Sequence, residues 1–282
     1  MSGAEYFSTD QAINPYYGAN ILNVEQAKLE HAEIKRLFEE AGIFVETTAA
    51  PMGSQDGVYT ANWALVRGKK AVLARLPNVR KAEEALAERT LQERGCEVLH
   101  VPNDWHFSGQ GDTLAFGGML FCGMGYRSDE QAQIFAASAL GYERIQLQTI
   151  PELDALGNPM INTVTGWPDS FFYDLDLALA IIKAPDEAQG GIVAYCPDAF
   201  MPSSQETLRR LKGFEKIEVS FEEATQGFAC NLVSTGETVI MSNRAPKLKK
   251  ELEKRGLKVV SPDVTELVKG GGFIRCVSLT LE

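Results

Sequence analysis

The chain has little histidine and an odd number of cysteines. Only three histidines and five cysteines occur among its 282 residues, and no two cysteines form a Cys-x-x-Cys pair. Structural zinc sites need closely spaced Cys and His ligands, and disulfide frameworks in small secreted chains use an even number of cysteines. The sequence therefore argues against both kinds of scaffold. The cysteines are Cys96, Cys122, Cys196, Cys230 and Cys276.

Positive charge is also scarce. Twenty-seven Lys and Arg face 38 Asp and Glu, which gives a formal net charge of -11. Nucleic acids and anionic membranes attract concentrated positive surfaces, so neither is an expected partner, whereas a small cationic substrate suits this balance. No apolar run is long enough to span a bilayer, and Met1–Tyr6 lacks the basic and apolar regions of a secretory signal. We expect a cytoplasmic protein with one domain over residues 1–282.

A helix, a glycine and a short apolar run recur five times along the chain. Apolar residues at helical spacing, each followed by glycine, predict these helices, and the runs after the glycines predict strands. Five similar modules is the simplest count, although an ordinary layered α/β sheet would give the same alternation. The expected helices lie at 25–41, 80–95, 128–140, 205–211 and 245–255.

Turn signals between these helices predict strand pairs and loops. Residues 59–66 and 71–76 flank a Gly-Lys-Lys turn, and residues 113–115 and 119–122 flank a Gly-Gly turn. No segment has the composition of a linker or a low-complexity tract. The expected loops are 49–55, 154–169 and 184–190.

The last thirteen residues place a lone cysteine, Cys276, after three glycines that begin at Gly270. Glycine allows a tight turn and a close approach to a ligand. The alternation of Val277, Leu279 and Leu281 with polar residues predicts a half-buried closing strand. Read alone, the segment favours an inert buried thiol after a turn, and the other segments below reverse this preference.

Three carboxylates lie in unusual surroundings. Asp112 directly follows a flexible Gly-x-Gly, and Asp174 and Asp176 interrupt an otherwise apolar run. Alternation along a strand would point Asp174 and Asp176 to one face, where two carboxylates need cations, hydrogen bonds or a shared proton. An edge strand with two solvated acids is the alternative. Asn14 and Asn62 lie beside turns, where asparagine is usually a backbone cap.

Taken together and in order, nine segments resemble the guanidino-group-modifying enzymes, which include arginine deiminases, dimethylarginine hydrolases, amidinotransferases and arginine dihydrolases. The resemblance spans essentially the whole chain and is greatest to the arginine dihydrolase and amidinotransferase-like proteins. It implies a single-domain, five-bladed, pseudo-symmetric α/β-propeller (pentein) with its active site in the central channel. The segments are Asp10-Gln-Ala-Ile-Asn-Pro15, Asp56-Gly-Val-Tyr-Thr-Ala-Asn62, Arg80-x-x-Glu83, Gly109-Gln-Gly-Asp112, Gly125-Tyr-Arg-Ser-Asp129, Phe172-Tyr-Asp-Leu-Asp176, Pro197-Asp-Ala-Phe200, Phe228-Ala-Cys-Asn231 and Gly270-Gly-Gly-Phe-Ile-Arg-Cys276.

The resemblance also implies site residues. Cys276 matches the nucleophile, whose thiolate attacks the guanidinium carbon to form a covalent thiouronium. Asp112 and Asp176 match carboxylates that hold the planar, cationic guanidinium. Asn14 and Asn62 match amides that assist a second hydrolysis in the dihydrolase branch. Neither a metal nor an organic cofactor is implied.

Two positions depart from the family pattern. The family has His-x-Asp where this chain has Asp174-Leu-Asp176, so Asp174 replaces the usual acid/base histidine. An aspartate would need a pKa raised by burial and by the neighbouring carboxylate to do that work. Ser108 stands where relatives carry a glutamate. Of the three histidines, His106 is the nearest to a substitute base, although packing is its commoner role.

The sequence thus predicts a cysteine-dependent hydrolase acting on the guanidino C–N bond of arginine or a related guanidino or ureido compound, with ornithine or citrulline and ammonia as products. A catalytically impaired ligand-binding or regulatory homologue and an amidinotransferase are the alternatives. A homodimer is the usual expectation for the family.

Overall fold

Four copies of one small unit make up most of the molecule. The computed structural model describes residues 1–17, 21–102, 104–186 and 190–281. In each unit an antiparallel strand pair is followed by a helix and then by a third strand, which pairs parallel to the second. The sheets are β1 (Ala64–Arg67), β2 (Lys70–Leu73) and β3 (Glu97–His100); β4 (Thr113–Phe116), β5 (Met119–Gly123) and β6 (Glu143–Leu147); β7 (Leu179–Lys183), β8 (Ile192–Tyr195) and β9 (Glu215–Glu218); and β10 (Val233–Ser234), β11 (Thr238–Ile240) and β12 (Lys258–Val260).

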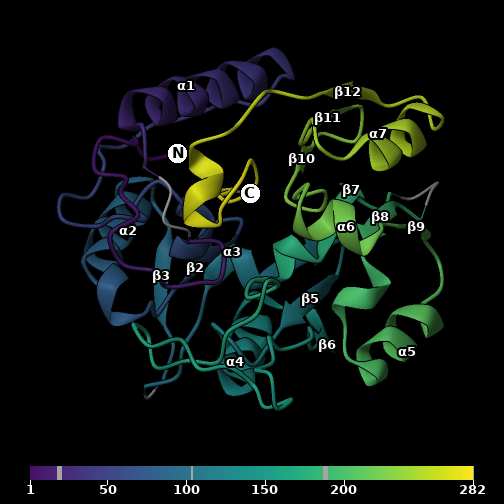
Figure 1. The fold of residues 1–282 in the computed structure, drawn as a ribbon, viewed down its shortest axis with the longest axis horizontal. Helices are drawn as coiled ribbons and strands as arrows, with labels where there is room; N and C mark the ends of the chain where they lie inside the picture. Colours follow the sequence, from purple (N-terminus) through teal and green to yellow (C-terminus); the bar gives the residue numbers. More distant parts are fainter. Residues whose placement is uncertain (18–20, 103, 187–189, 282) are drawn as a thin grey trace.

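The five predicted helices are all present. They lie on the outside of the molecule, around strands that face the centre (Figure 1). Helical spacing of apolar residues identified them because each buries one face on the core and exposes the other. They are α1 (Val24–Glu40), α2 (Ala82–Glu93), α4 (Glu130–Leu140), α5 (Pro202–Arg210) and α7 (Pro246–Glu253).

The unit that begins with α1 is different. The apolar run after Gly42 was expected to form a strand, but within the described residues it makes only one isolated bridge, between Ser2 and Thr48. The described residues therefore form a mixed α/β domain with four small sheets, and helix α1 has no sheet of its own.

Helix α1 is instead tied to the chain's C-terminal part by one buried carboxylate. Glu30 accepts hydrogen bonds from the backbone N–H groups of Thr265, Glu266 and Leu267, at 2.8 to 3.0 Å. These donors lie at the start of the short helix η5 (Leu267–Gly270), where backbone N–H groups have no acceptor within the helix. The contact fixes the start of the segment that carries Cys276.

Three local predictions were wrong. Residues 277–281 form no strand, because their polar groups contact side chains such as Gln110 rather than a neighbouring strand. Asp174 and Asp176 do not lie on a strand: Asp174 precedes the single turn η3 (Leu175–Leu177). The glycines before Asp112 form the short helix α3 (Gly109–Asp112) rather than an open turn.

Two of the three predicted loops, 49–55 and 154–169, contain no regular helix or strand. The third, 184–190, includes residues 187–189, which lie outside the described part of the chain.

Candidate active site

Cys276 lies in the interior, at the end of the glycine segment. Its Sγ atom accepts a hydrogen bond from Nδ2 of Asn231 at 3.1 Å and lies 3.5 Å from Oδ2 of Asp176. The Asn231 side-chain oxygen in turn accepts the backbone N–H groups of Arg275 and Cys276. Asn231 therefore fixes both the thiol and the backbone that carries it. Asn231 belongs to one of the nine segments that resemble the family, but no role was predicted for it.

One glycine of the segment is required by its conformation. Gly271 has φ +84°, and a Cβ atom there would lie 2.6 Å from the side-chain oxygen of Asn14. Any other residue would be strained and would displace that amide. Asn14 also donates from Nδ2 to the carbonyl of Gly270 at 3.1 Å. The predicted amide thus packs directly against the glycine segment.

Asp174 is held by two of the residues that the sequence singled out. Its Oδ1 accepts the Ser108 hydroxyl at 2.8 Å, and its Oδ2 accepts Nδ2 of Asn62 at 2.7 Å. Burial raises the pKa of this carboxyl, whereas the guanidinium of Arg127 and these two donors act in the opposite direction. Ser108 and Asp174, the two positions predicted to depart from the family pattern, therefore form a hydrogen bond with each other.

Behind Asn62 lies a buried ion pair. Arg80 donates to the side-chain oxygen of Asn62 at 2.8 Å and makes a bidentate pair with Glu83, at 2.8 and 2.7 Å. Glu83 is fully buried and also accepts the Trp63 indole N–H at 2.9 Å. The pair orients the amide so that its NH₂ group faces Asp174. The Arg-x-x-Glu spacing, on one side of a helical turn, was the only signal of this network in the sequence.

The two predicted guanidinium carboxylates have different surroundings. Asp112 accepts the backbone N–H of Leu175 at 3.1 Å, so one of its oxygens positions the turn after Asp174. Oδ2 of Asp112 and Oδ1 of Asp176 have no hydrogen-bond partner in the described part of the protein, although both are buried. Burial and the charge of Asp174 raise the pKa of both carboxyls well above its usual range.

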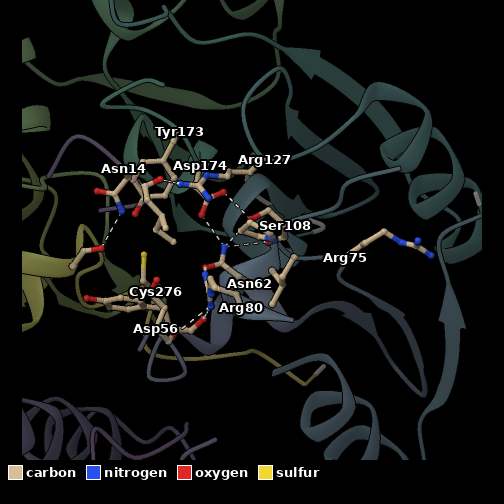
Figure 2. A pocket seen from close by; sticks show the side chains of 15 residues that line it. Asn14, Asp56, Asn62, Arg75, Arg80, Ser108, Arg127, Tyr173, Asp174 and Cys276 are labelled. Carbon is tan, nitrogen blue, oxygen red and sulfur yellow. Dashed lines mark hydrogen bonds between the residues drawn. The ribbon is translucent and has the colours of Figure 1, made fainter. Parts of the chain in front are cut away.

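Cys276 and Asp174 line one small cavity of about 20 Å³ (Figure 2). Asn14 and Asn62 line it too, whereas Asp112 and Asp176 do not. Three arginines and a second carboxyl, to which the sequence had assigned no role, also line the cavity. These are Arg75, Arg80, Arg127 and Asp56.

Arg127 closes one side of the cavity. It donates to the carbonyl of Ile13, and its guanidinium lies 5.0 Å from the ring centre of Tyr173 and 5.7 Å from that of Trp167. His106 stacks on the far side of this cluster, with its ring centre 4.1 Å from that of Trp167, and does not line the cavity. The structure thus gives His106 a packing contact.

The resting thiol is poorly ionised. Burial and the charge of Asp176 raise the pKa of Cys276 well above its usual range, although Asn231 opposes the shift. A thiol becomes a nucleophile when it loses its proton, and a nearby cation favours that loss. A positively charged ligand beside Sγ would favour ionisation of this thiol.

Known proteins are similar to this chain over almost all of its length. No protein-family model matches the sequence. The bifunctional arginine dihydrolase/ornithine cyclodeaminase ArgZ of Synechocystis is 31% identical over 288 residues, which cover 99% of this chain but 37% of that protein. The N(G),N(G)-dimethylarginine dimethylaminohydrolase of Mycobacterium tuberculosis is 29% identical, over 100% of this chain and 84% of that enzyme. The chain therefore spans just over a third of the first relative.

The solved structures agree. A mutant of the N-terminal domain of ArgZ, bound to substrate, has a TM-score of 0.86 and 29% sequence identity, over 99% of this chain and 96% of that one. This chain is similar over its whole length to the guanidino-group-modifying enzymes. The members of this superfamily that it resembles act on the guanidino group of arginine or dimethylarginine, as their names state.

The polar groups of the site form one hydrogen-bonded set. Between the thiol and the buried pair of Arg80 and Glu83 lies a carboxyl, with an amide and a hydroxyl as its donors. In the described ranges, no group of three or more His, Cys, Asp or Glu side chains could hold a metal ion. None of the described helices has the length and apolar character needed to cross a bilayer.

Proposed function

We propose that the chain is a cysteine-dependent hydrolase of the guanidino C–N bond of arginine or a close relative. The observation that carries the proposal is that the thiol of Cys276 and the carboxyl of Asp174 line one small cavity, together with Asn14 and Asn62. This chemistry needs a thiol as the nucleophile and a titratable group as the acid or base, both within reach of one bound substrate.

The charges of the cavity support an amino-acid substrate. Arg127 lines it as a cation and would attract a carboxylate, and Asp56 has a buried Oδ2 without a hydrogen-bond partner in the described residues, which would accept an ammonium group. Asp176, 3.5 Å from Sγ, would hold the guanidinium, with Asp112 behind it. Free arginine carries all three complementary charges.

In the first step the thiol would lose its proton as the guanidinium binds. Sγ then attacks the guanidinium carbon, and the thiol proton, passed through Asp174, leaves with the departing nitrogen as ammonia. The product of this step is a thiouronium on Cys276. Hydrogen bonds to both of its oxygens hold Asp174 in place, and burial raises its pKa, which suits it to receive that proton and pass it on.

In the second step Asp174 takes a proton from water, and the resulting hydroxide equivalent attacks the thiouronium carbon. The C–S bond breaks and leaves citrulline and the free thiol. Repetition of both steps on the ureido group would give ornithine, a second ammonia and carbon dioxide. Asn14 and Asn62, as predicted, would support that second round.

The test is product analysis by mass spectrometry, with arginine, agmatine, methylarginines and citrulline as candidate substrates. We expect ornithine or citrulline plus ammonia, and we expect Cys276→Ala to lower kcat at least about 10³-fold because the nucleophile is lost. Cys196→Ala, which removes another buried thiol, is the matched control and should retain activity. Products that require ornithine or glycine as acceptor would indicate an amidinotransferase instead.

A ligand-binding homologue is the second candidate, favoured by one observation, the raised pKa of the resting Cys276 thiol. In that case calorimetry would detect binding of arginine, but no product would depend on Cys276. Absence of both binding and turnover at millimolar ligand would overturn both candidates.

We also propose that α1 belongs to a fifth, reduced blade of the propeller. Residues 43–46 and 278–281 line the same large cavity on the inner side of the molecule, where a fifth sheet would close the ring. An experimental structure with strand pairing between these two segments would support this arrangement.

A further inference from the structure

A second cavity reaches the site from another direction. It has a volume of about 1110 Å³, and neither Cys276 nor Asp174 lines it. The side chains that line it include Asp176, Gln110, Thr113, Leu114, Arg275 and Ser278. Only Asp176, among the residues proposed for the chemistry, belongs to this larger cavity.

Asp176 separates the two cavities. Its Oδ2 lies 3.5 Å from Sγ of Cys276, which lines the small cavity, while its own side chain lines the large one. Its Oδ1 is buried and has no partner among the described residues. Buried polar atoms are nearly always hydrogen-bonded, to ordered water where no protein group is available. A water molecule in the large cavity is the natural partner for this oxygen.

The proposed reaction needs a second route. Once the thiouronium has formed, the amino-acid part of the substrate is covalently attached and fills the small cavity, which even when empty has a volume of only about 20 Å³. Ammonia must nevertheless leave and water must arrive before the intermediate can be hydrolysed. The entrance used by the substrate is occupied during that exchange.

We infer that the large cavity is the route by which water enters and ammonia leaves, past Asp176, while the amino acid stays bound on the other side. This inference rests on the proposed function. The exchange balances: the thiol and the guanidinium give ammonia and a thiouronium, and the thiouronium and water give the ureido product, the thiol and a proton. Water and ammonia are both small enough to pass beside the Asp176 side chain.

The first test narrows this route. Ser278 lines the cavity two residues from Cys276, so Ser278→Trp should obstruct the end nearest the site. Glu237→Trp adds the same bulk at an exposed position of the same cavity and is the control. We expect Ser278→Trp to lower kcat at least tenfold relative to the control, whereas arginine binding, measured by calorimetry in the Cys276→Ala background, should change less than twofold.

The second test widens the route. Leu114→Ala should admit hydroxylamine, which attacks the thiouronium in place of water and gives an N-hydroxyguanidine and the free thiol. We expect the ratio of N-hydroxyguanidine to ureido product to rise at least threefold. Leu208→Ala, an equally buried leucine that does not line the cavity, should leave this ratio unchanged.

Two outcomes would overturn the inference. One is a Ser278→Trp variant that binds arginine and has the kcat of its control; the other is a Leu114→Ala variant with the product ratio of the wild type. Either result in a protein whose turnover depends on Cys276 would leave the proposed function intact. Loss of Cys276-dependent turnover in the wild type would instead contradict the function itself.

Discussion

At the scale of single residues, Asp174 and Ser108 form one hydrogen-bonded unit. The sequence marked Asp174 and Ser108 as separate departures from the family pattern, and the structure joins them by a hydrogen bond of 2.8 Å. Asn62 completes the set from another segment. The resemblance to the family marked each of the two residues. The contact between Ser108 and Asp174 depends on the fold, which brings together positions that are 66 residues apart.

The contact predicts that the two positions are energetically coupled. We expect Asp174→His combined with Ser108→Glu to be at least tenfold more active than the separate effects of the two substitutions predict, because glutamate orients an imidazole that serine alone does not. A tenfold coupling corresponds to about 1.4 kcal/mol. The double variant should also acquire an acidic limb in its pH–rate profile near the ordinary histidine pKa of about 6.5.

A double-mutant cycle on kcat/KM measures this coupling, with the wild type, both single variants and the double variant. Strictly additive effects would show that the two positions act independently. A profile without the new limb would show that the introduced imidazole takes no part in proton transfer.

At the scale of elements, helices were easier to predict than the segments that carry chemistry. Helix α1 and its four counterparts follow from apolar periodicity, which reflects burial of one face. The segment 277–281 has strand-like alternation as well, but Gln110 takes up its backbone groups in place of a strand. Side-chain acceptors of this kind arise from distant residues, so local pattern cannot reveal them.

Glu30 is another side-chain acceptor for distant backbone groups, and its contribution to the free energy of unfolding can be measured. Replacement of Glu30 by Gln should lower the free energy of unfolding by about 2 kcal/mol, because a charged acceptor of several buried N–H groups is lost. Glu33→Gln, on the same helix, removes an exposed pair with Arg36 and should cost at most about 0.5 kcal/mol. Urea unfolding of both variants checks the difference, and equal costs would show that Glu30 is not a structural anchor.

At the scale of the whole molecule, modular counting succeeded for four units and failed to anticipate the form of the fifth. The strand–strand–helix–strand pattern in the sequence repeats in four sheets. The fifth module has its predicted helix, α1, but no sheet accompanies it among the described residues. In the fifth blade proposed above, the remaining parts would come from opposite ends of the given sequence, where a linear reading cannot pair them. The network of Arg80 with Glu83, Asn62 and Asp174 was not predicted as a whole, because its contacts join residues from separate segments of the sequence.

Stability as a function of pH is also a property of the whole molecule. Burial raises the pKa of Asp56 from 3.8 to about 6 in the folded state. A raised carboxyl pKa stabilises the fold below the unfolded pKa, and that contribution is lost as the pH rises from about 4 to about 6. Asp56→Asn removes this term, so the variant should gain stability relative to the wild type, on the order of 2 kcal/mol, between pH 4 and pH 7.

Urea unfolding at several pH values measures the difference between the two proteins. His31 titrates in the opposite sense over a similar range, since burial lowers its pKa to about 4, but it is common to both proteins and cancels from the difference. A difference that does not change with pH would show that Asp56 keeps an ordinary pKa in the folded protein.

The hydrogen bond between Asn14 and the carbonyl of Gly270 joins residues 256 positions apart. Asn14 is therefore synthesised long before the segment that it contacts. A nascent chain that already contains the residues of all four sheets, the last of which ends at Val260, still lacks Cys276, the proposed nucleophile. If Cys276 has that role, the chemistry can begin only when synthesis has passed residue 276.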